Sequence, residues 1–280
     1  MFAGLASCRI DTTSALPEGV THRLDAMVSK DGEVVPFVKA VEITKGMSVN
    51  DWLKDLEHQM KSTLAYLLEK AVSEDNTHEN RSQGDGGMQA FVAWATKFPA
   101  QVMILAAQIY WSTAVDKSLR SDNSAAALQE VLAGLEWRLE VMAKTVLMEL
   151  PPDSRKKFEQ LITELVRQRD VVRSLIDDKV ANVSDFRWLY HLRYTYNPKA
   201  EKISEKLWAS LSNAKFSYGF EYLGIGERLV QTPLTDKCYL TLTQALHFRM
   251  GGSPFGPAGT GKPFVRRAKN SCMCGINACS

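Results

Sequence analysis

The sequence has little of what marks secreted, disulfide-bonded or membrane-spanning proteins. Its five cysteines are an odd number, and Cys8 and Cys238 are isolated, which does not fit a disulfide framework. Residues 1–20 lack the basic and continuous apolar segments of a signal peptide. The longest apolar stretch, near residues 102–107, is far shorter than the roughly 20 residues that cross a bilayer. We therefore expect a chain of the reducing cytoplasm that is neither secreted nor inserted into a membrane.

The sequence also lacks an excess of charge of either sign. Lys and Arg number 34 and Asp and Glu 32, so a nucleic acid or an anionic membrane is not indicated as a partner by charge alone. Residues 253–280 differ from the rest, because they contain no acidic residue. Their basic residues are Lys262, Arg266, Arg267 and Lys269. Hydrophobic residues make up 45% of the chain and charged residues 24%, proportions that exclude wholesale disorder.

Apolar residues recur at helical spacing over most of the first 180 positions. The predicted helices are residues 50–72, residues 99–119, residues 124–150 and a fourth that begins at Asp153 or Ser154. Asn50 is the expected N-cap of the first helix, and Pro151 and Pro152 end the third. Apolar stripes of this kind usually pack against neighbouring helices, so no ligand is inferred from them.

Three further segments interrupt the helical pattern. Residues 73–87 carry no large apolar side chain, which predicts a mobile surface loop. Residues 33–43 are rich in valine and include Pro36, which is typical of an edge strand. Alternating aromatic residues at 215–222 predict a second strand, followed by a turn and an extended piece at residues 228–231. The expected fold is mainly α, a helical bundle with small β elements.

A short motif near the C-terminus carries specific chemistry. Residues 256–262 read GPAGTGK, the G-x-x-x-x-G-K core of a phosphate-binding loop. Glycines let successive backbone N–H groups converge on a phosphate, and the lysine supplies a cation for the terminal phosphates. The candidate binding residues are Gly256, Pro257, Ala258, Gly259, Thr260, Gly261 and Lys262. A glycine-rich turn without a ligand is the alternative for so short a match.

The residue that follows this motif departs from it. A complete motif continues with Ser or Thr, whose hydroxyl coordinates Mg²⁺, but here the position is Pro263. Proline has neither a hydroxyl nor a backbone N–H, although it is compatible with the first turn of a helix. We therefore expect the loop to form but to bind nucleotide weakly and with little dependence on Mg²⁺.

Other candidate sites have weaker support. The cysteines of the C-x-C-x₄-C cluster at residues 272–279 offer three thiolates with no fourth ligand nearby, so we expect no metal site. His191 and His247 have no nucleophile in an elbow motif beside them and are interpreted as packed or surface histidines, which leaves no catalytic residue to name. Aromatic residues and arginines at 186–196 are also found on single-strand nucleic-acid surfaces, but core packing explains their spacing better.

A longer stretch that ends in the phosphate loop resembles one protein family. Residues 216–262 read FSYGFEYLGIGERLVQTPLTDKCYLTLTQALHFRMGGSPFGPAGTGK, which resembles the opening of the first AAA+ module of cytoplasmic dynein heavy chains. The segments MFAGLAS, GEVVPFVKAVEI, NDWLKDLE, FPAQVMILAAQIYW and DFRWLYHLRY resemble the dynein linker domain. The resemblance covers about residues 1–262, so the chain is expected to be a fragment of a much larger motor.

The resemblance implies a division of the chain. Residues 1–196 correspond to the helical linker, residues 197–262 to the start of the first AAA+ module, an incomplete α/β P-loop domain, and residues 263–280 match nothing expected. A frameshift, a retained intron or a misassembled gene is our hypothesis for that tail, which we expect to be disordered. In the family, the linker lies across a ring of AAA+ modules and swings toward the microtubule minus end as ATP is hydrolysed.

The resemblance also implies a ligand, site residues and partners. Five residues match the loop that packs around adenine, and ATP, with Mg²⁺ in the parent protein, is the implied cofactor. The five are Leu229, Val230, Thr232, Pro233 and Leu234. The family's Walker B acid, sensors and arginine finger lie outside this chain, so we expect no ATPase activity from it. The implied partners are the remaining AAA+ ring, dynein intermediate and light intermediate chains, and microtubules. The alternative is a non-catalytic helical interaction fragment with impaired nucleotide binding.

Overall fold

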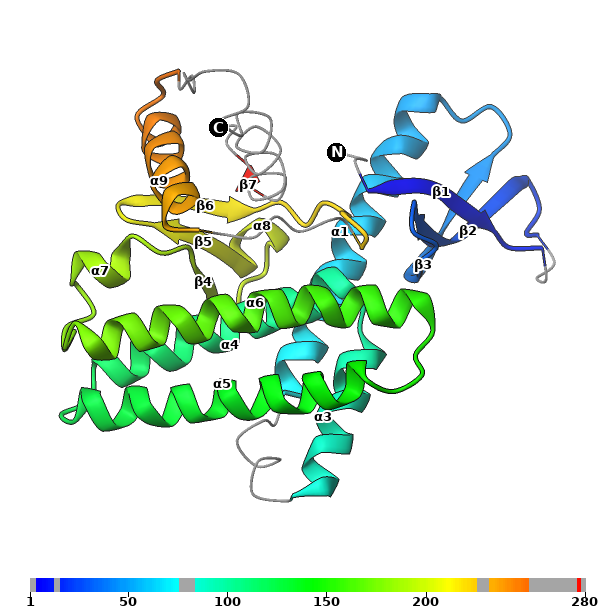
Figure 1. Cartoon of the computed structure of the whole chain (residues 1–280). Coiled ribbons are helices and arrows are strands. Elements are labelled where there is room, and N and C mark those ends of the chain that lie inside the picture. Colours follow the sequence, from blue (N-terminus) through cyan, green and yellow to red (C-terminus); the bar gives the residue numbers. More distant parts are fainter. Residues whose placement is uncertain (1–3, 13–15, 76–83, 226–231, 252–275, 278–280) are drawn as a thin grey trace, which may run out of the picture.

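The computed structural model describes residues 4–12, 16–75, 84–225, 232–251 and 276–277 (Figure 1). Its helices and strands confirm the predicted class, mainly α with small antiparallel sheets. Within these ranges, no helix combines the length and the apolar character needed to cross a membrane.

The N-terminal part forms a three-stranded antiparallel sheet. Its strands are β1 (Leu5–Ile10), β2 (Val20–Ser29) and β3 (Val34–Thr44), in the order β1-β2-β3. The prediction of an edge strand is confirmed by β3, which contains Pro36 and has only β2 as a paired neighbour among the described strands. The other two strands were not predicted, because β1 has no fully buried residue and β2 buries side chains mainly in its second half.

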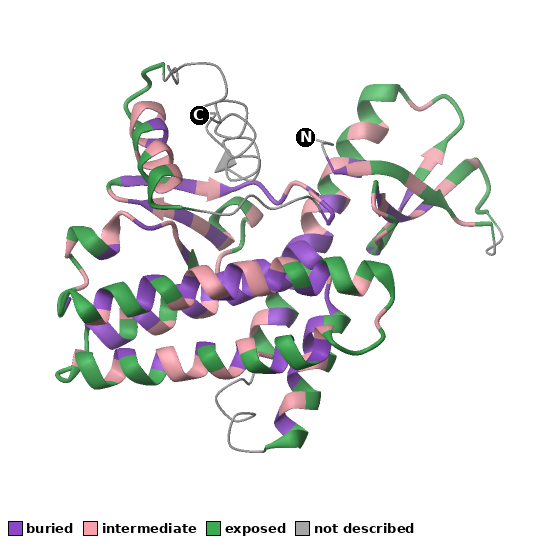
Figure 2. Ribbon diagram, in the orientation of Figure 1, coloured by how far each residue is buried: buried purple, intermediate pink, exposed green. Residues whose placement is uncertain are grey.

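Five long helices form the main body. They are α1 (Val49–Ser73), α3 (Asp85–Lys97), α4 (Ala100–Leu119), α5 (Ser124–Val146) and α6 (Pro152–Asp177). The central helix is α4, which packs against α1, α5 and α6. Its residues 100–109 are all buried, whereas α5 and α6 alternate between buried and exposed positions (Figure 2). A helix that is apolar all round must be covered on every side, so α4 organises the elements around it.

The predicted helix boundaries needed three corrections. The N-cap of α1 is Ser48 instead of Asn50, because the Ser48 hydroxyl accepts the N–H of Asp51 at 3.3 Å. Helix α5 ends at Val146, short of the predicted residue 150. Helix α6 begins at Pro152 rather than after Asp153 or Ser154, since the fixed φ of proline suits the first helical position.

The predicted loop at residues 73–87 is shorter than expected. Ser73 is the last residue of α1, and residues 85–87 open α3, where Gly87 is buried. Residues 76–83 lie outside the described ranges. The polar composition of this segment concealed the helix start, because Asp85 and two glycines begin it without an apolar signal.

A second antiparallel sheet follows the helices. It contains β4 (Arg193–Tyr196), β5 (Leu207–Leu211), β6 (Ala214–Tyr218) and β7 (Ile276–Asn277), in that order. The remaining helices are α7 (Phe186–Leu189), α8 (Ile203–Lys206) and α9 (Pro233–His247). The aromatic strand predicted at 215–222 is confirmed as far as Tyr218, but the extended piece predicted at 228–231 lies outside the described residues. The β4–β5 pairing was not predicted.

A buried ion pair ties the end of α1 to α5. Arg138 Nη2 lies 3.0 Å from a carboxylate oxygen of Asp75, and their side chains are 1% and 5% exposed. The guanidinium also lies over the Tyr110 and Phe91 rings, 4.1 and 5.4 Å from their centroids. A charge in such a place depends on its opposite charge, because water is excluded.

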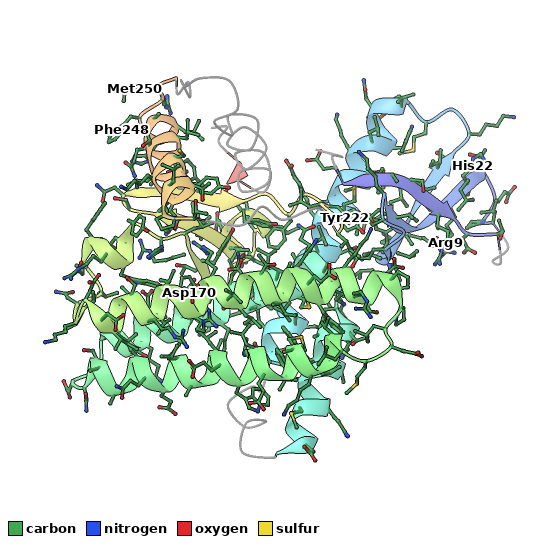
Figure 3. The ribbon with its side chains drawn as sticks, in the orientation of Figure 1. Arg9, His22, Asp170, Tyr222, Phe248 and Met250 are labelled. Atoms are coloured by element: carbon green, nitrogen blue, oxygen red, sulfur yellow. The ribbon has the colours of Figure 1, made fainter. Side chains whose placement is uncertain are left out.

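We predict that Asp75→Asn lowers the free energy of unfolding by about 3–5 kcal/mol, because it removes the carboxylate from a buried guanidinium. The matched control is Asp170→Asn on α6, where an exposed carboxylate contacts Arg169 (Figure 3). That change should cost about 0–1 kcal/mol. Urea denaturation of the two variants and the wild type measures both values, and equal losses would contradict the prediction.

Candidate functional site

The described part of the predicted adenine segment forms the start of α9. Thr232 is the N-cap: its hydroxyl accepts the N–H of Thr235 at 3.3 Å, and the Thr235 hydroxyl accepts the N–H of Thr232 at 2.7 Å. Pro233 occupies the first helical turn, where its missing N–H needs no partner. The Leu234 side chain follows, 72% exposed. This reciprocal cap fixes where the helix begins and leaves an apolar side chain free at its tip.

The other predicted site residues lie outside the described part of the chain. They are Leu229, Val230, Gly256, Pro257, Ala258, Gly259, Thr260, Gly261 and Lys262, together with Pro263. The structure therefore brings together Thr232, Pro233 and Leu234, and it leaves the phosphate loop as a prediction. The cysteine cluster at 272–279 also falls almost wholly outside, and the described residues contain no group of three or more potential metal ligands.

Residues 219–225, which we call the strap, connect β6 to the segment ahead of α9. The strap leaves the second sheet and runs to the β1–β3 sheet (Figure 1), where Gly4 N donates to Tyr222 O at 3.2 Å. Phe220, Tyr222 and Ile225 are buried. Gly224 has a φ of 63°, and a Cβ there would lie 2.6 Å from the Ser29 Cβ. The strap is therefore packed closely against the N-terminal sheet and admits no side chain at that position.

A charged side chain from the first sheet also holds the strap. Tyr222 Oη donates to Glu33 Oε2 at 3.2 Å, where the strap meets the sheet and the helices (Figure 3). Burial, followed by the negative charge of Glu33, raises the pKa of Tyr222 far above its ordinary value. The other carboxylate oxygen of Glu33 accepts the N–H of Ala100 at 2.8 Å, at the start of α4. One carboxylate thus joins the sheet, the strap and the central helix.

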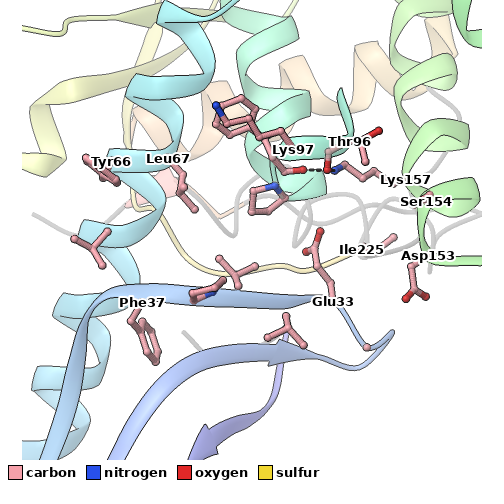
Figure 4. A pocket seen from close by; sticks show the side chains of 17 residues that line it. Glu33, Phe37, Tyr66, Leu67, Thr96, Lys97, Asp153, Ser154, Lys157 and Ile225 are labelled. Carbon is pink, nitrogen blue, oxygen red and sulfur yellow. Dashed lines mark hydrogen bonds between the residues drawn. The ribbon is translucent and has the colours of Figure 1, made fainter. Parts of the chain in front are cut away.

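A cavity of about 520 Å³ lies beside this junction, between β3, α1 and the α3–α4 corner (Figure 4). On its other wall Lys157 of α6 donates to the carbonyls of Thr96 and Phe98, at the end of α3. Burial lowers the pKa of Lys157 to about 8, although Glu33 acts in the opposite direction. The Glu33 carboxylate meets the positive N-terminal end of α4, and the Lys157 ammonium meets the negative C-terminal end of α3. Both charges therefore have structural partners, and we interpret the cavity as part of a structural junction and not as a reaction site.

A buried polar cluster packs α9 against the helices. His191 Nδ1 lies 4.0 Å from Asp236 Oδ2, in the first turn of α9. Burial, with smaller contributions from Arg167 and Arg193, lowers the pKa of His191 to about 3. Burial also raises the pKa of Asp236. The interpretation of His191 as a packed histidine is confirmed, since its side chain is buried.

Of the aromatic residues at 186–196, Trp188 and Tyr194 are buried, as core packing predicts, whereas Phe186 is 59% exposed. The Trp188 ring is fully buried and meets the Trp111 ring edge to face, with centroids 5.1 Å apart. Trp188 Nε1 donates to Asp116 at 2.7 Å, and Tyr194 N donates to the Ser112 hydroxyl at 3.0 Å. Both acceptors belong to α4, so this cluster fastens the second sheet to the central helix.

Comparison with known proteins shows which family the chain resembles. The family model for dynein heavy chain, N-terminal region 2, matches residues 1–71, and that for the hydrolytic ATP binding site of the dynein motor region matches residues 218–268. The cytoplasmic dynein heavy chain of Dictyostelium discoideum is 46% identical over 279 residues, which cover 97% of this chain. The chain belongs to the dynein heavy-chain family. The Drosophila melanogaster cytoplasmic dynein heavy chain is 42% identical over 265 residues, or 94% of this chain.

This dynein segment spans 6% of the length of each of those two relatives. The match to the ATP-binding family model begins at Tyr218 and includes the strap, the start of α9 and the phosphate-loop motif. The motif and the adenine segment were predicted from the sequence, but Glu33, which accepts hydrogen bonds from the strap and α4, and Asp236 in the first turn of α9 were not singled out. Lone charges in short polar stretches carry no pattern that marks them as buried.

We predict that the buried neutral His191 makes the protein sensitive to acid. Its pKa is lower in the folded state than in the unfolded state, so folding loses stability as the pH falls from about 6.5 toward 3, by about 1.4 kcal/mol per pH unit. His191→Gln should flatten this dependence between pH 4.5 and 6.5 in urea denaturation. The exposed His22→Gln is the control (Figure 3) and should keep the wild-type slope; an unchanged slope in His191→Gln would contradict the assignment.

Proposed function

We propose that this chain supplies the C-terminal part of the linker and the opening of the first AAA+ nucleotide site of an ATP-driven microtubule motor. The observation that carries the proposal is the match of residues 218–268 to the dynein ATP-binding family model, within a chain that aligns over most of its length with dynein heavy chains. The strap and α9 add support, since both lie within the residues that this family model matches and both are packed onto the preceding helices and sheets.

In this proposal, residues at the start of α9 contact the adenine and the GPAGTGK segment holds the phosphates. Leu229, Val230, Thr232, Pro233 and Leu234 form the adenine side. The exposed Leu234 side chain supplies apolar surface of the kind that a flat base covers. Backbone N–H groups of residues 256–262 and the Lys262 ammonium would meet the phosphates. ATP is the proposed ligand, and the Mg²⁺ contact is weakened by Pro263.

The wider role belongs to the same proposal. Such a segment would work with the remaining AAA+ ring, with dynein intermediate and light intermediate chains and with microtubules, in the cytoplasm and on the cytoskeleton. We expect no phosphate release from the isolated chain, because hydrolysis needs the acid that positions water and an arginine finger from a neighbouring module. Its contribution is to bind and to position the nucleotide.

We predict saturable binding of a fluorescent ATP analogue to the purified chain, abolished in Lys262→Ala because the phosphates lose their cation. The control is Lys237→Ala, which removes an exposed lysine from α9 and should leave the dissociation constant unchanged. Fluorescence anisotropy measures all three proteins. Loss of binding in both variants would indicate a nonspecific charge effect, and no binding by the wild type would count against the proposal.

We also predict that Pro263→Thr strengthens binding and makes it depend on Mg²⁺. A restored hydroxyl and a restored backbone N–H both contact the nucleotide–metal group, which should lower the dissociation constant about tenfold or more with Mg²⁺ present. Pro263→Ala is the matched control, because it restores the N–H without the hydroxyl and should gain affinity without gaining Mg²⁺ dependence. Identical titrations of the three proteins with and without EDTA would contradict the role given to this position.

Pro263 is also the observation that favours the alternative, a non-catalytic helical interaction fragment. In that case the wild type would fail to bind nucleotide, while circular dichroism would show the helical content of a folded protein. The same titrations therefore separate the two functions.

A further inference from the structure

Gln101 stands out as a polar side chain in the most apolar part of the chain. It lies in the first turn of α4, within a run of residues that are buried from Ala100 to Ile109. Its own exposure is 7%. A buried amide in such a place must be hydrogen-bonded, because an unsatisfied one costs free energy.

Among the described residues, the hydrogen bonds of this side chain go to the strap and to the strand end that precedes it. Gln101 Nε2 donates to Tyr218 Oη at 2.9 Å and to the Glu221 carbonyl at 2.7 Å. Gln101 Oε1 accepts the N–H of Leu223 at 2.8 Å. The amide thus binds two backbone groups on either side of Tyr222, in the manner of a neighbouring strand.

The strap needs this support because it has little regular structure of its own. Phe220 takes a positive φ of 50°, and residues 219–224 belong to no helix or strand. Besides Gln101, its polar contacts include those of Tyr222 with Gly4 and Glu33. Loss of the Gln101 amide would leave the Glu221 carbonyl and the Leu223 N–H without these partners in a water-poor site.

The contact between Gln101 and the strap matters because the strap precedes the predicted adenine segment in the chain. Ile225 ends the strap, and Thr232 caps α9 seven positions later in the sequence. The strap is therefore the covalent approach to the predicted adenine segment, and Gln101 fixes it to the central helix of the linker-like region. Asp236, in the first turn of α9, lies 4.0 Å from His191 Nδ1, apart from the contacts of Gln101.

We propose that Gln101 is a positioning residue for the nucleotide site: its amide registers the strap against α4, and the strap leads along the chain to the first turn of α9, which carries Thr232, Pro233 and Leu234. The proposal rests on the proposed function for its effect on nucleotide, but its effect on the strap does not depend on that function.

The test compares Gln101→Met with Gln108→Met. Gln108 lies on the same helix and is 5% exposed, but its Oε1 accepts no hydrogen bond from the described residues. Gln108→Met thus removes an amide that is buried to the same degree but makes no contact with the strap. Hydrogen exchange by mass spectrometry and titration with the fluorescent ATP analogue are measured on the full chain, at a temperature where circular dichroism shows both variants folded.

In Gln101→Met, the exchange rate of strap amides, including that of Leu223, should rise about tenfold or more. The exchange rates of α5 amides should match those in Gln108→Met. The dissociation constant for the analogue should rise about tenfold in Gln101→Met only. Equal exchange in the strap of both variants would overturn the proposal, as would unchanged affinity of Gln101→Met.

Failure of the proposed function has a different signature. If the wild type binds no nucleotide, the nucleotide role of the chain is overturned, and Gln101 is judged on strap exchange alone. Should Gln101→Met not fold, Gln101→Glu takes its place, since it keeps the acceptor for Leu223 and removes both donors. Its strap must then exchange faster than that of the wild type, and wild-type exchange would overturn the proposal.

Discussion

The arrangement depends on the N-terminal half of α4, in which residues 100–109 are all buried. A helix with apolar residues on every face cannot lie at a surface, so α1, α5, α6 and the second sheet must all pack against it. Its few polar groups then become attachment points, because each must find a partner away from water. Ser112 holds β4 of the second sheet, Asp116 holds α7, and Gln101 holds the strap. Because α4 is central and largely buried, it is also the element to which the strap, which precedes the predicted nucleotide segment, is fixed.

Much of the fold could be predicted from periodic patterns. The regular spacing of apolar residues predicted α1, α4, α5 and α6, because buried helices repeat apolar residues at helical intervals. The valine-rich β3 and the aromatic β6 were also visible. Strands β1 and β2 were not, since they bury few side chains and depend on pairing with β3, which is a contact between distant positions.

The candidate site likewise has parts that could be predicted from the sequence and parts that could not. The phosphate-loop motif and the adenine segment are local, so their residues can be recognised in order along the chain. The groups that hold the approach come from far away: Glu33 lies in the turn between two strands, and Gln101 opens a helix more than a hundred positions before the residues it binds. Gln101 did give one signal, an amide inside an apolar run, but that signal says only that a partner exists and not which one.

The corner between α3 and α4 has a consequence for any bending of this region. Lys157 from α6 covers the carbonyl end of one helix, and Glu33 from the first sheet covers the amide end of the next. Opening that corner would separate two oppositely charged side chains from two helix ends at once. Force applied at either the sheet or α6 should therefore be transmitted through the corner without bending it.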